Sequence, residues 1–357
     1  MRLLELQAVN VRNLVDVDLR FSPQCNLVCG SNGSGKSSLL EAIYLLGRGK
    51  SFRTHRLSRV THFDQRAFAV RGRVQFEQRE RRLAARYEHG GLQLTEGDTP
   101  LKRASDLIPL LPLTLISTDS HKLFSDGPKQ RRKFIDWGVF HVEHLFLEEW
   151  GHYCRALSQR NALLRQARYG ATLEAWDREL QRMAETIDQW RRAYVEALQQ
   201  RFLSMLPLLL PLPGLSLSYV RGWPDDLDLH THLKATHERD ARLGYTRDGP
   251  HAADLLITLH AVPAQDCVSR GQQKLIISAL YLAQAALFAE RLDQPCVVLV
   301  DDLPAELDAD RRQSLLEVLS QLRSQVFLTA IEDNSIDVNA FSEYQVFHVK
   351  QGVVRAA

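Results

Sequence analysis

The sequence contains little of what would place a protein in a specialised class. It has five cysteines among 357 residues, an odd number scattered without a C-x-x-C pair. This pattern excludes a disulfide framework and a cysteine-based zinc site, so we expect reduced thiols and a cytosolic protein. The formal net charge is +2, which excludes a strongly basic chain. Any surface for nucleic acid must therefore be a local basic patch.

Long apolar segments are also missing from the sequence. The longest uncharged helical run, residues 275–289, falls short of the roughly 20 residues that span a bilayer. The apolar run at residues 206–217 is interrupted by prolines, and residues 1–5 contain no apolar core of a signal peptide. We therefore expect no membrane-spanning segment and no membrane partner.

A phosphate-binding loop is the most informative feature that is present. Residues 30–37 fit the pattern G-x-x-x-x-G-K-[S/T], between a strand-like run at 25–29 and a helix-forming run at 38–46. Glycines let the backbone wrap around an anion, and the helix N-terminus adds partial positive charge. A glycine–serine surface turn is the alternative. The candidate nucleotide-binding residues of the loop are Gly30, Ser31, Asn32, Gly33, Ser34, Gly35, Lys36, Ser37 and Ser38.

The second motif is an apolar, β-branched run at residues 297–300 that ends in Asp301 and Asp302. A strand that ends in a carboxylate is the usual companion of a phosphate loop, and Asp301 and Ser37 are the candidate Mg²⁺ ligands. Asp302 is placed to orient the attacking water, so Asp302 and Lys36 are the catalytic candidates. The alternative is an ordinary strand end with two solvated aspartates.

The third motif is a serine–arginine–glycine turn before a second long helix, at Ser269, Arg270 and Gly271. Such a helix start is again an anion site. One nucleotide rarely needs two of them, so we expect this one to meet the γ-phosphate held by a second copy of the chain. Ser269 would donate its hydroxyl and Gly271 its N–H, with Gln272 in the same candidate set. The alternative is a capped helix with an exposed polar start.

The pattern of apolar residues divides the chain into three parts. The first is rich in predicted strands, at residues 15–21, 67–70, 73–76 and 113–116. The second predicts an antiparallel helical hairpin, with apolar steps of three and four over residues 147–164 and 173–202. In the third, predicted strands alternate with helices, at residues 254–260, 272–291, 297–300, 311–323 and 326–329. We predict an α/β head formed by residues 1–125 and 245–357, with an inserted helical lobe at 126–244.

These motifs together resemble the ATPase heads of the ABC/SMC class, and among them the bacterial RecF family. Further segments carry the resemblance, at residues 6–14, 49–54, 127–136, 244–251 and 306–308. It covers nearly the whole chain, and the short inserted lobe fits RecF better than SMC proteins, whose arms are far longer. The fold that it implies is an α/β, ABC/SMC-type P-loop ATPase head with an inserted short helical lobe.

The resemblance also implies a function. RecF-like proteins bind ATP and Mg²⁺, form a head-to-tail homodimer around two nucleotides, and are expected to be slow, DNA-stimulated ATPases. They bind double-stranded DNA at gaps and at single-strand/double-strand junctions, and they act with RecR and RecO to place RecA on gapped DNA. By this resemblance Arg12 lies near the phosphates, and Glu306, Leu307 and Asp308 match a dimer-interface loop.

Some positions depart from the family pattern or leave the function open. Ala252 stands where the family often has arginine, Ala305 stands where serine is frequent, and residues 329–332 lack the switch histidine of ABC transporters. The DNA-contact candidates form two basic sets: Lys129, Arg131, Arg132 and Lys133, and Arg79, Arg81, Arg82 and Arg86. A solvated charged surface is the alternative for both. A transport-type ABC subunit and an ATP-binding scaffold without hydrolysis are the competing functions.

Overall fold

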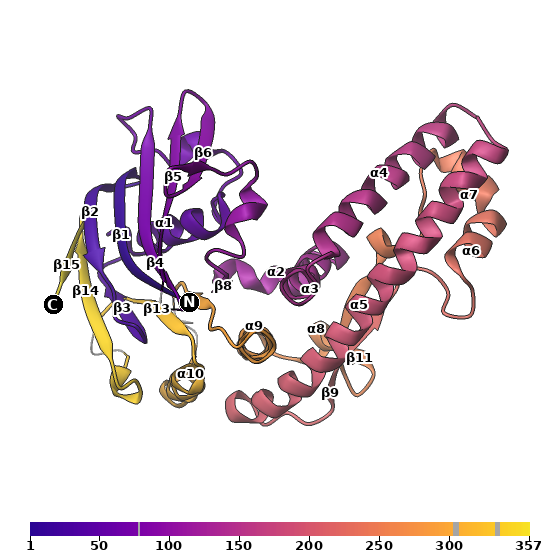
Figure 1. The fold of residues 1–357 in the computed structure, drawn as a ribbon. Coiled ribbons are helices and arrows are strands. Elements are labelled where there is room, and N and C mark those ends of the chain that lie inside the picture. Colours follow the sequence, from indigo (N-terminus) through magenta and orange to yellow (C-terminus); the bar gives the residue numbers. More distant parts are fainter. Residues whose placement is uncertain (78, 303–306, 333–335) are drawn as a thin grey trace. The chain divides into compact units, whose positions relative to one another are not determined.

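The structure is a computed structural model that describes residues 1–77, 79–302, 307–332 and 336–357. Its contacts divide the chain into two compact units. The first consists of residues 1–120, 208–210 and 274–357, and the second of residues 121–207 and 211–273. In Figure 1 the first unit is coloured mainly indigo, purple and yellow, and the second mainly magenta and orange.

These units differ from the predicted head and lobe mainly at residues 245–273, and also at residues 121–125 and 208–210. The sequence assigns residues 245–273 to the head, whereas their contacts place them in the second unit. The physical reason is strand pairing, because β10 (Asp254–Leu259) lies antiparallel to β9 (Leu215–Val220). β11 (Val262–Pro263) completes this small sheet, and its three strands belong to one unit.

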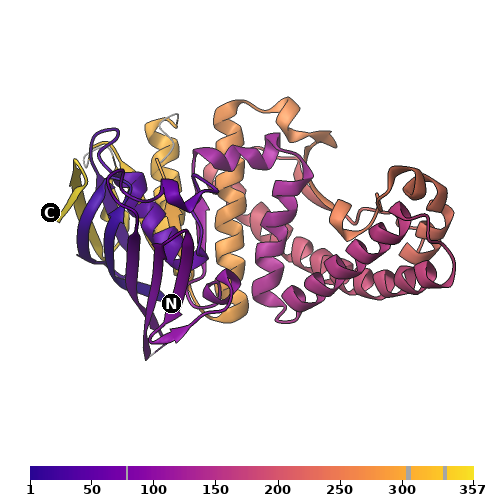
Figure 2. The ribbon, with the colours of Figure 1, turned by 90° about the horizontal axis from the view of Figure 1, so that it is seen from above.

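The first unit contains an antiparallel sheet with the strand order β2-β1-β4-β5-β6-β7. Its longer strands run side by side in indigo and purple in Figure 2. One face is apolar and buried: Leu6 of β1 lies opposite Leu19 of β2 and Gly72 of β4. The strands are β1 (Arg2–Val11), β2 (Leu14–Arg20), β4 (Phe68–Phe76), β5 (Arg79–Glu88), β6 (Gly91–Glu96) and β7 (Thr99–Pro100).

A second, mostly parallel sheet in the same unit has the order β15-β14-β3-β13-β12-β8. Every residue of β3, β12 and β13 is buried, as expected for strands covered on both faces. Because parallel strands end at the same edge, the loops after β3 and β12 lie at one edge, with the end of β13 between them. The strands are β3 (Cys25–Cys29), β8 (Leu113–Ile116), β12 (Val297–Val300), β13 (Gln325–Ala330), β14 (Tyr344–Lys350) and β15 (Val353–Ala356).

One apolar core joins both sheets to α1 (Lys36–Arg48), the helix that follows the phosphate loop.

α9 (Arg270–Leu292) is long and apolar enough to cross a membrane, but 72% of its apolar window is buried in the fold, as in a core helix. No other helix within the described ranges passes that test. The unit also contains α10 (Ala309–Gln321), η1 (Leu57–Arg59), η2 (Ala104–Leu107) and η6 (Val338–Ala340), and most of η3 (Thr118–His121).

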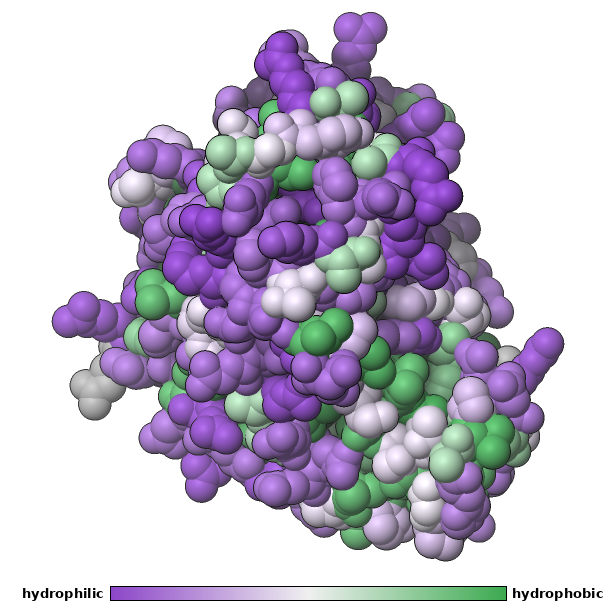
Figure 3. Space-filling model, turned by 90° about the vertical axis from the view of Figure 1, so that its right-hand side faces the viewer, coloured by the Kyte–Doolittle hydropathy of each residue, from purple (hydrophilic) through white to green (hydrophobic). Residues whose placement is uncertain are grey.

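The second unit confirms the predicted helical hairpin. α4 (Phe146–Arg165) and α5 (Ala171–Leu209) run side by side in Figure 1, and Arg182 of α5 binds Glu149 of α4. Figure 3 shows one face of the molecule, which is mainly hydrophilic with apolar side chains gathered in its lower part. The remaining elements are α2 (Lys122–Ser125), α3 (Pro128–Val142), α6 (Leu229–Ala235), α7 (His237–Leu243), η4 (Pro250–Ala252) and α8 (Ala264–Cys267).

Two buried arginines hold the hairpin to the rest of the second unit. The side chain of Arg160 on α4 is fully buried, and it donates to Asp177, Asp240 and Thr246 at 2.6, 2.9 and 2.8 Å. Arg191 on α5 is equally buried and binds the carboxylate of Asp136 through two nitrogens and the carbonyl of Pro250. Segments 127–136 and 244–251, singled out in the sequence, thus supply partners for buried charges, which such charges require.

Candidate nucleotide-binding site

The phosphate loop connects β3 to α1 at the carboxyl edge of the parallel sheet. Gly35 is the N-cap of α1 with φ 124°, and no side chain caps this helix start. Glycine adopts such a φ without strain. At Gly30 a Cβ would overlap the carbonyl oxygen of Val349, so the close approach of β14 also requires glycine. The first N–H groups of α1 are therefore left without a side-chain acceptor, which is the arrangement of an anion site.

Lys36 and Asn13 shape the loop from its two sides. The Lys36 ammonium donates to the carbonyls of Gly30 and Ser31 at 2.7 and 3.1 Å, so it lies within the curve of the loop. Asn13, between β1 and β2, donates to the carbonyl of Ser34 at 2.9 Å and accepts from the Ser38 hydroxyl at 2.8 Å. The loop conformation is thus fixed by its own lysine and by Asn13 from the turn between β1 and β2.

Ser37 and Asp301 meet at the predicted metal position. The Ser37 hydroxyl donates to the Asp301 carboxylate at 2.9 Å, and Thr329 on β13 donates to the same oxygen at 3.2 Å. Burial raises the pKa of the Asp301 carboxyl above its ordinary value, and the bonds from Ser37 and Thr329 oppose that shift. Hydroxyl and carboxylate oxygens are the ligand types that Mg²⁺ prefers, so these residues fit a magnesium site.

Asp302 has a backbone conformation that is uncommon outside glycine. Its φ is 57°, in the left-handed region, and its N–H donates to the Thr329 hydroxyl at 2.5 Å. Aspartate tolerates this region better than most residues, and such conformations concentrate at functional sites. The turn leaves the Asp302 side chain exposed at the pocket that contains the phosphate loop.

Arg12 lines the same pocket but is held by an internal carboxylate. Its guanidinium donates to both oxygens of Glu41 at 2.9 Å and to the carbonyl of Arg59 at 2.6 Å. Glu41, on α1, is fully buried and also accepts from Ser51 and lies 3.7 Å from Arg53. Arg12 can therefore contact a phosphate only through guanidinium N–H groups that do not take part in these bonds.

One pocket of about 600 Å³ brings most of the predicted loop residues together with others. Predicted residues in its lining are Arg12, Asn32, Gly33, Gly35, Lys36, Ser37, Ser38 and Asp302. The pocket is also lined by residues that were not predicted as site residues: Asn13, Arg53, Thr61, His62, Phe63 and Thr329. Thr329 could have been predicted, because it is the last residue of the strand predicted at residues 326–329, and side chains at the ends of parallel strands face the site. For His62 and Phe63 the sequence contained no such signal.

The start of α9 belongs to the second unit and has its own cap. The Ser269 N–H donates to the Gln272 side chain at 2.9 Å, and the Gln272 N–H donates to the Ser269 hydroxyl at 3.3 Å. This reciprocal pair is a capping box, so the capped helix considered from the sequence is present. Ser269 and Arg270 are nevertheless exposed and accessible to a partner.

The segment after Asp302 is described only in part. Ala305 and Glu306 lie outside the described residues. Leu307 is buried, and the Asp308 carboxylate accepts from the Arg311 N–H at 2.8 Å as the N-cap of α10. Asp308 therefore has a structural role in the single chain, and a role at a dimer interface stays a prediction.

The first basic set is less available than its sequence suggests. Arg131 on α3 binds both oxygens of Asp254 at 2.7 and 2.8 Å, and Arg132 donates to the carbonyl of Ala253 at 2.7 Å. Both arginines are partly buried, whereas Lys129 and Lys133 are exposed. Two of the four candidates are therefore engaged in holding α3 to β10 and to the residue that precedes it.

The second basic set is divided between the two faces of β5, because side chains alternate along a strand. Arg81 binds Glu96 at 2.8 Å and lies over the ring of Phe76. Arg82 and Arg86 are on the opposite face and exposed. Arg82 lies opposite Arg73 of β4, and the guanidinium of Arg73 is paired with Glu5 and Glu80 on the same face. Arg79 is exposed at the start of the strand.

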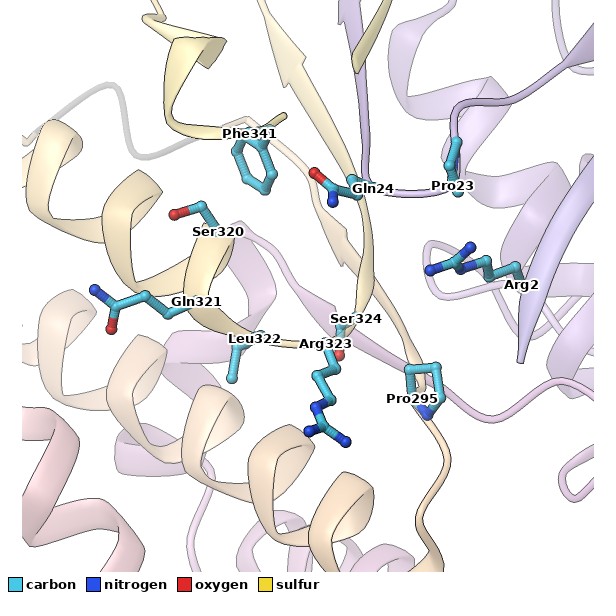
Figure 4. A pocket seen from close by; sticks show the side chains of 10 residues that line it. All are labelled: Arg2, Pro23, Gln24, Pro295, Ser320, Gln321, Leu322, Arg323, Ser324 and Phe341. Atoms are coloured by element: carbon cyan, nitrogen blue, oxygen red, sulfur yellow. The ribbon is translucent and has the colours of Figure 1, made fainter. Parts of the chain in front are cut away.

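A second pocket of about 400 Å³ lies at the other edge of the parallel sheet (Figure 4). Its residues precede strands rather than follow them: Gln24 comes before β3, Pro295 before β12 and Ser324 before β13. Arg2 and Arg323 supply guanidinium groups to its lining. Ligands of open α/β sheets bind at the carboxyl ends of the strands, which favours the phosphate-loop pocket.

Comparison with known proteins agrees with this geometry. The model of the RecF/RecN/SMC N-terminal domain matches residues 2–355. The DNA replication and repair protein RecF of Stutzerimonas stutzeri is 43% identical over 360 residues, 99% of this chain and 97% of its own length. The chain belongs to the RecF family. The RecF of Azotobacter vinelandii is 46% identical over 347 residues, covering 96% of this chain and 95% of that protein.

A solved RecF structure shows that the likeness extends to the fold. The recombination mediator protein RecF of the RecFOR pathway, in a structure with ATP, has a TM-score of 0.85 at 26% identity. The match covers 100% of this chain and 97% of that chain. The predicted α/β ABC/SMC-type P-loop head with an inserted helical lobe is thereby confirmed.

Proposed function

We propose that this RecF-family protein binds ATP with Mg²⁺ in the phosphate-loop pocket and hydrolyses it there. One observation carries the proposal: the loop after β3 and the aspartates after β12 converge, with the Ser37 hydroxyl 2.9 Å from Asp301. Ser37 and Asp301 are 264 positions apart in the sequence. Their meeting at one edge of the sheet is what a nucleotide and its metal require.

Each residue then has a defined task. Lys36 and the first N–H groups of α1 bind the phosphates, and the oxygens of Ser37 and Asp301 hold Mg²⁺. When bound, the ion neutralises charge on the phosphate chain. Asp302 orients the attacking water and accepts its proton, while Thr329 fixes the backbone of Asp302. The contact between Asp302 N–H and Thr329 supports this assignment.

The ATP-bound form is proposed to be a head-to-tail homodimer. Ser269, Gly271 and Gln272 of one copy meet the γ-phosphate held by the other. The exposure of Ser269 and Arg270 supports this arrangement, as does the open α1 start in the pocket of the first unit. Binding of ATP would join two chains, and hydrolysis would separate them.

The biological role follows from the family. A relative is named a DNA replication and repair protein, and a family structure is described as a recombination mediator of the RecFOR pathway. We propose that the dimer binds double-stranded DNA at gaps and junctions in the cytoplasm, and places RecA there with RecR and RecO. The exposed charges of Lys129, Lys133, Arg82 and Arg86 are the candidates for backbone contacts. DNA is expected to stimulate a slow ATPase.

Light scattering tests directly whether ATP joins two chains. The mass is measured with ATP, with ADP and without nucleotide, each with and without gapped DNA. We expect a dimer only with ATP, and ATPase turnover that rises with gapped DNA. Equal mass in all three nucleotide states would contradict ATP-dependent dimerisation. ATPase turnover that is the same with and without DNA would favour an ABC-type subunit with another partner.

A further inference from the structure

We propose that Phe63 is the platform on which the base of the bound nucleotide stacks. The pocket would then select a nucleoside triphosphate over a bare polyphosphate chain. This inference rests on the proposed nucleotide-binding function of the head and assigns a further residue to the same site.

Phe63 is the apolar exception in a polar pocket. Within the described part of the chain, every other side chain that lines this pocket is polar or charged, or is absent because the residue is glycine. The ring is 86% exposed, the highest fraction among the exposed large apolar side chains of the described residues. Single exposed apolar residues are ordinary on protein surfaces. The significance of this one is its position beside the phosphate loop.

The backbone that presents Phe63 is fixed on its N-terminal side. Val60 and Thr61 are buried, and Thr61 forms a β-bridge with Val11 at the end of β1. The His62 N–H donates to the carbonyl of Asn10 at 2.9 Å. The ring of His62 lies 5.0 Å from that of Phe63 between centroids. The exposed ring thus follows directly on an anchored segment.

The same anchor connects Phe63 to the phosphate loop. The Arg12 N–H donates to the carbonyl of Val60 at 2.6 Å. The next residue, Asn13, donates to the carbonyls of Gly33 and Ser34 at 3.2 and 2.9 Å. The turn between β1 and β2 therefore contacts both the loop that binds phosphate and the segment that carries the ring.

The chemistry of the pocket matches the parts of a nucleotide. Its cationic and N–H groups suit phosphates, and its hydroxyls and amides suit a ribose. An exposed phenyl ring offers nothing to either, but it stacks on a flat aromatic base. Since every base has a π-face, the platform alone selects for the presence of a base rather than for adenine.

The test compares two ligands that share a phosphate chain. Mg²⁺-ATP and inorganic tripolyphosphate with Mg²⁺ are each titrated against the full chain by calorimetry, for the unmutated protein and for Phe63→Ala. Phe63→Trp tests for restored stacking. Tyr344→Ala is the matched control, because Tyr344 is an exposed aromatic residue of the same unit outside the pocket lining. Thermal melting verifies that each variant folds.

We expect Phe63→Ala to raise the Kd for ATP about tenfold, the loss typical of one base–aromatic stack. Its Kd for tripolyphosphate should stay within about twofold of the unmutated value, because no stacking partner is present in that ligand. Phe63→Trp should restore ATP binding, and Tyr344→Ala should change neither Kd.

Two results would overturn the inference while leaving the proposed function intact. An unchanged Kd for ATP in Phe63→Ala would show that the ring carries no base. An equal loss for ATP and tripolyphosphate would show that the ring supports the loop instead. If the unmutated protein bound neither ligand, the proposed nucleotide function itself would fail, and this inference with it.

Discussion

Two long helices of this chain begin beside serine and glycine, yet their first turns differ. α1 starts after Gly35 with no side-chain cap, inside a pocket, next to a buried lysine. α9 starts at Arg270 with a reciprocal cap from Ser269 and Gln272, on an exposed surface. The first start leaves its N–H donors to a ligand. The second satisfies part of its donors itself and presents a hydroxyl outward.

This difference suggests different roles for the two helix starts: the α1 start binds the nucleotide, and the α9 start responds to a nucleotide held by another chain. A helix start that lacks a side-chain cap gains most from an anion, because its donors are otherwise unsatisfied. A helix start that is already capped gains less and is stable without the ligand. We therefore infer that the α1 start binds the nucleotide in each chain, whereas the α9 start contributes only when a second chain brings a phosphate to it.

The largest effect is expected at the α1 start. Lys36→Ala removes a buried charge that we propose binds phosphate, so the Kd for ATP should rise about a thousandfold, on the order of 4 kcal/mol. Calorimetric titration measures this change. Lys102→Ala, an exposed lysine outside the pocket, is the control and should bind ATP normally. ATP binding by Lys36→Ala at the unmutated affinity would break the comparison.

The next effect separates hydrolysis from binding. Asp302→Asn keeps the size of the side chain but removes the proton acceptor, so turnover should fall about a hundredfold. The Kd for ATP should stay within about twofold, because Lys36 and the helix start are intact. Steady-state turnover and calorimetry measure the two quantities. Asp310→Asn, an exposed aspartate of α10, is the control. Unchanged turnover in Asp302→Asn would remove Asp302 from the reaction.

A change at the α9 start should affect only the pair of chains. Ser269→Arg places a bulky cation at the exposed turn and removes the cap, which costs about 1 kcal/mol of stability. ATP affinity of the single chain should be retained within about twofold, while the ATP-dependent dimer and turnover should fall more than tenfold. Scattering and turnover report these effects, and Ser158→Arg on α4 is the control. A dimer that forms normally would leave α9 without a role in sensing.

The smallest effect concerns acidity at the metal position. The raised pKa of Asp301 means that its carboxyl takes up a proton at a higher pH than an ordinary aspartate. The protonated form does not hold a cation, so Mg²⁺ affinity in the presence of ATP should fall a few fold as pH is lowered, earlier than for an unperturbed carboxyl. Magnesium titrations across a pH series measure this trend. In Asp301→Asn the trend should be weaker by the part that this carboxyl contributes, because protonation of the ATP phosphates still lowers Mg²⁺ affinity. An unchanged trend in the variant would point to another group.

Sequence patterns were sufficient for the elements near the site. The strand before the phosphate loop, the helix after it and the strand before Asp301 appear as β3, α1 and β12. Each is signalled locally, by an apolar run or by glycines that a tight turn requires. The helical hairpin was equally clear from its spacing, although α5 continues through Pro207 to Leu209, where a proline would ordinarily end a helix.

Long-range contacts explain what the sequence left open. The predicted strands at 67–70 and 73–76 are one strand, β4, because it pairs with β5 without a break from Phe68 to Phe76. Gly72, at its centre, leaves room for Leu46 of α1 against the sheet. Arg131 looked like a free basic residue, but its partner Asp254 is 123 positions away. Thr329 and Phe63 reach the pocket only through strand order and a bridge to β1. No local pattern records such pairings.

Complementation between two inactive variants tests the shared pocket most directly. Lys36→Ala lacks the lysine proposed to bind phosphate, and Ser269→Arg lacks the serine turn proposed to meet the γ-phosphate, so each alone should hydrolyse ATP more than tenfold more slowly than the unmutated protein. A mixed dimer contains one pocket built from an intact loop and an intact turn, and mixing equal amounts should therefore restore ATP turnover. A mixture as inactive as its components, while both variants remain folded, would contradict the claim that two chains complete one site.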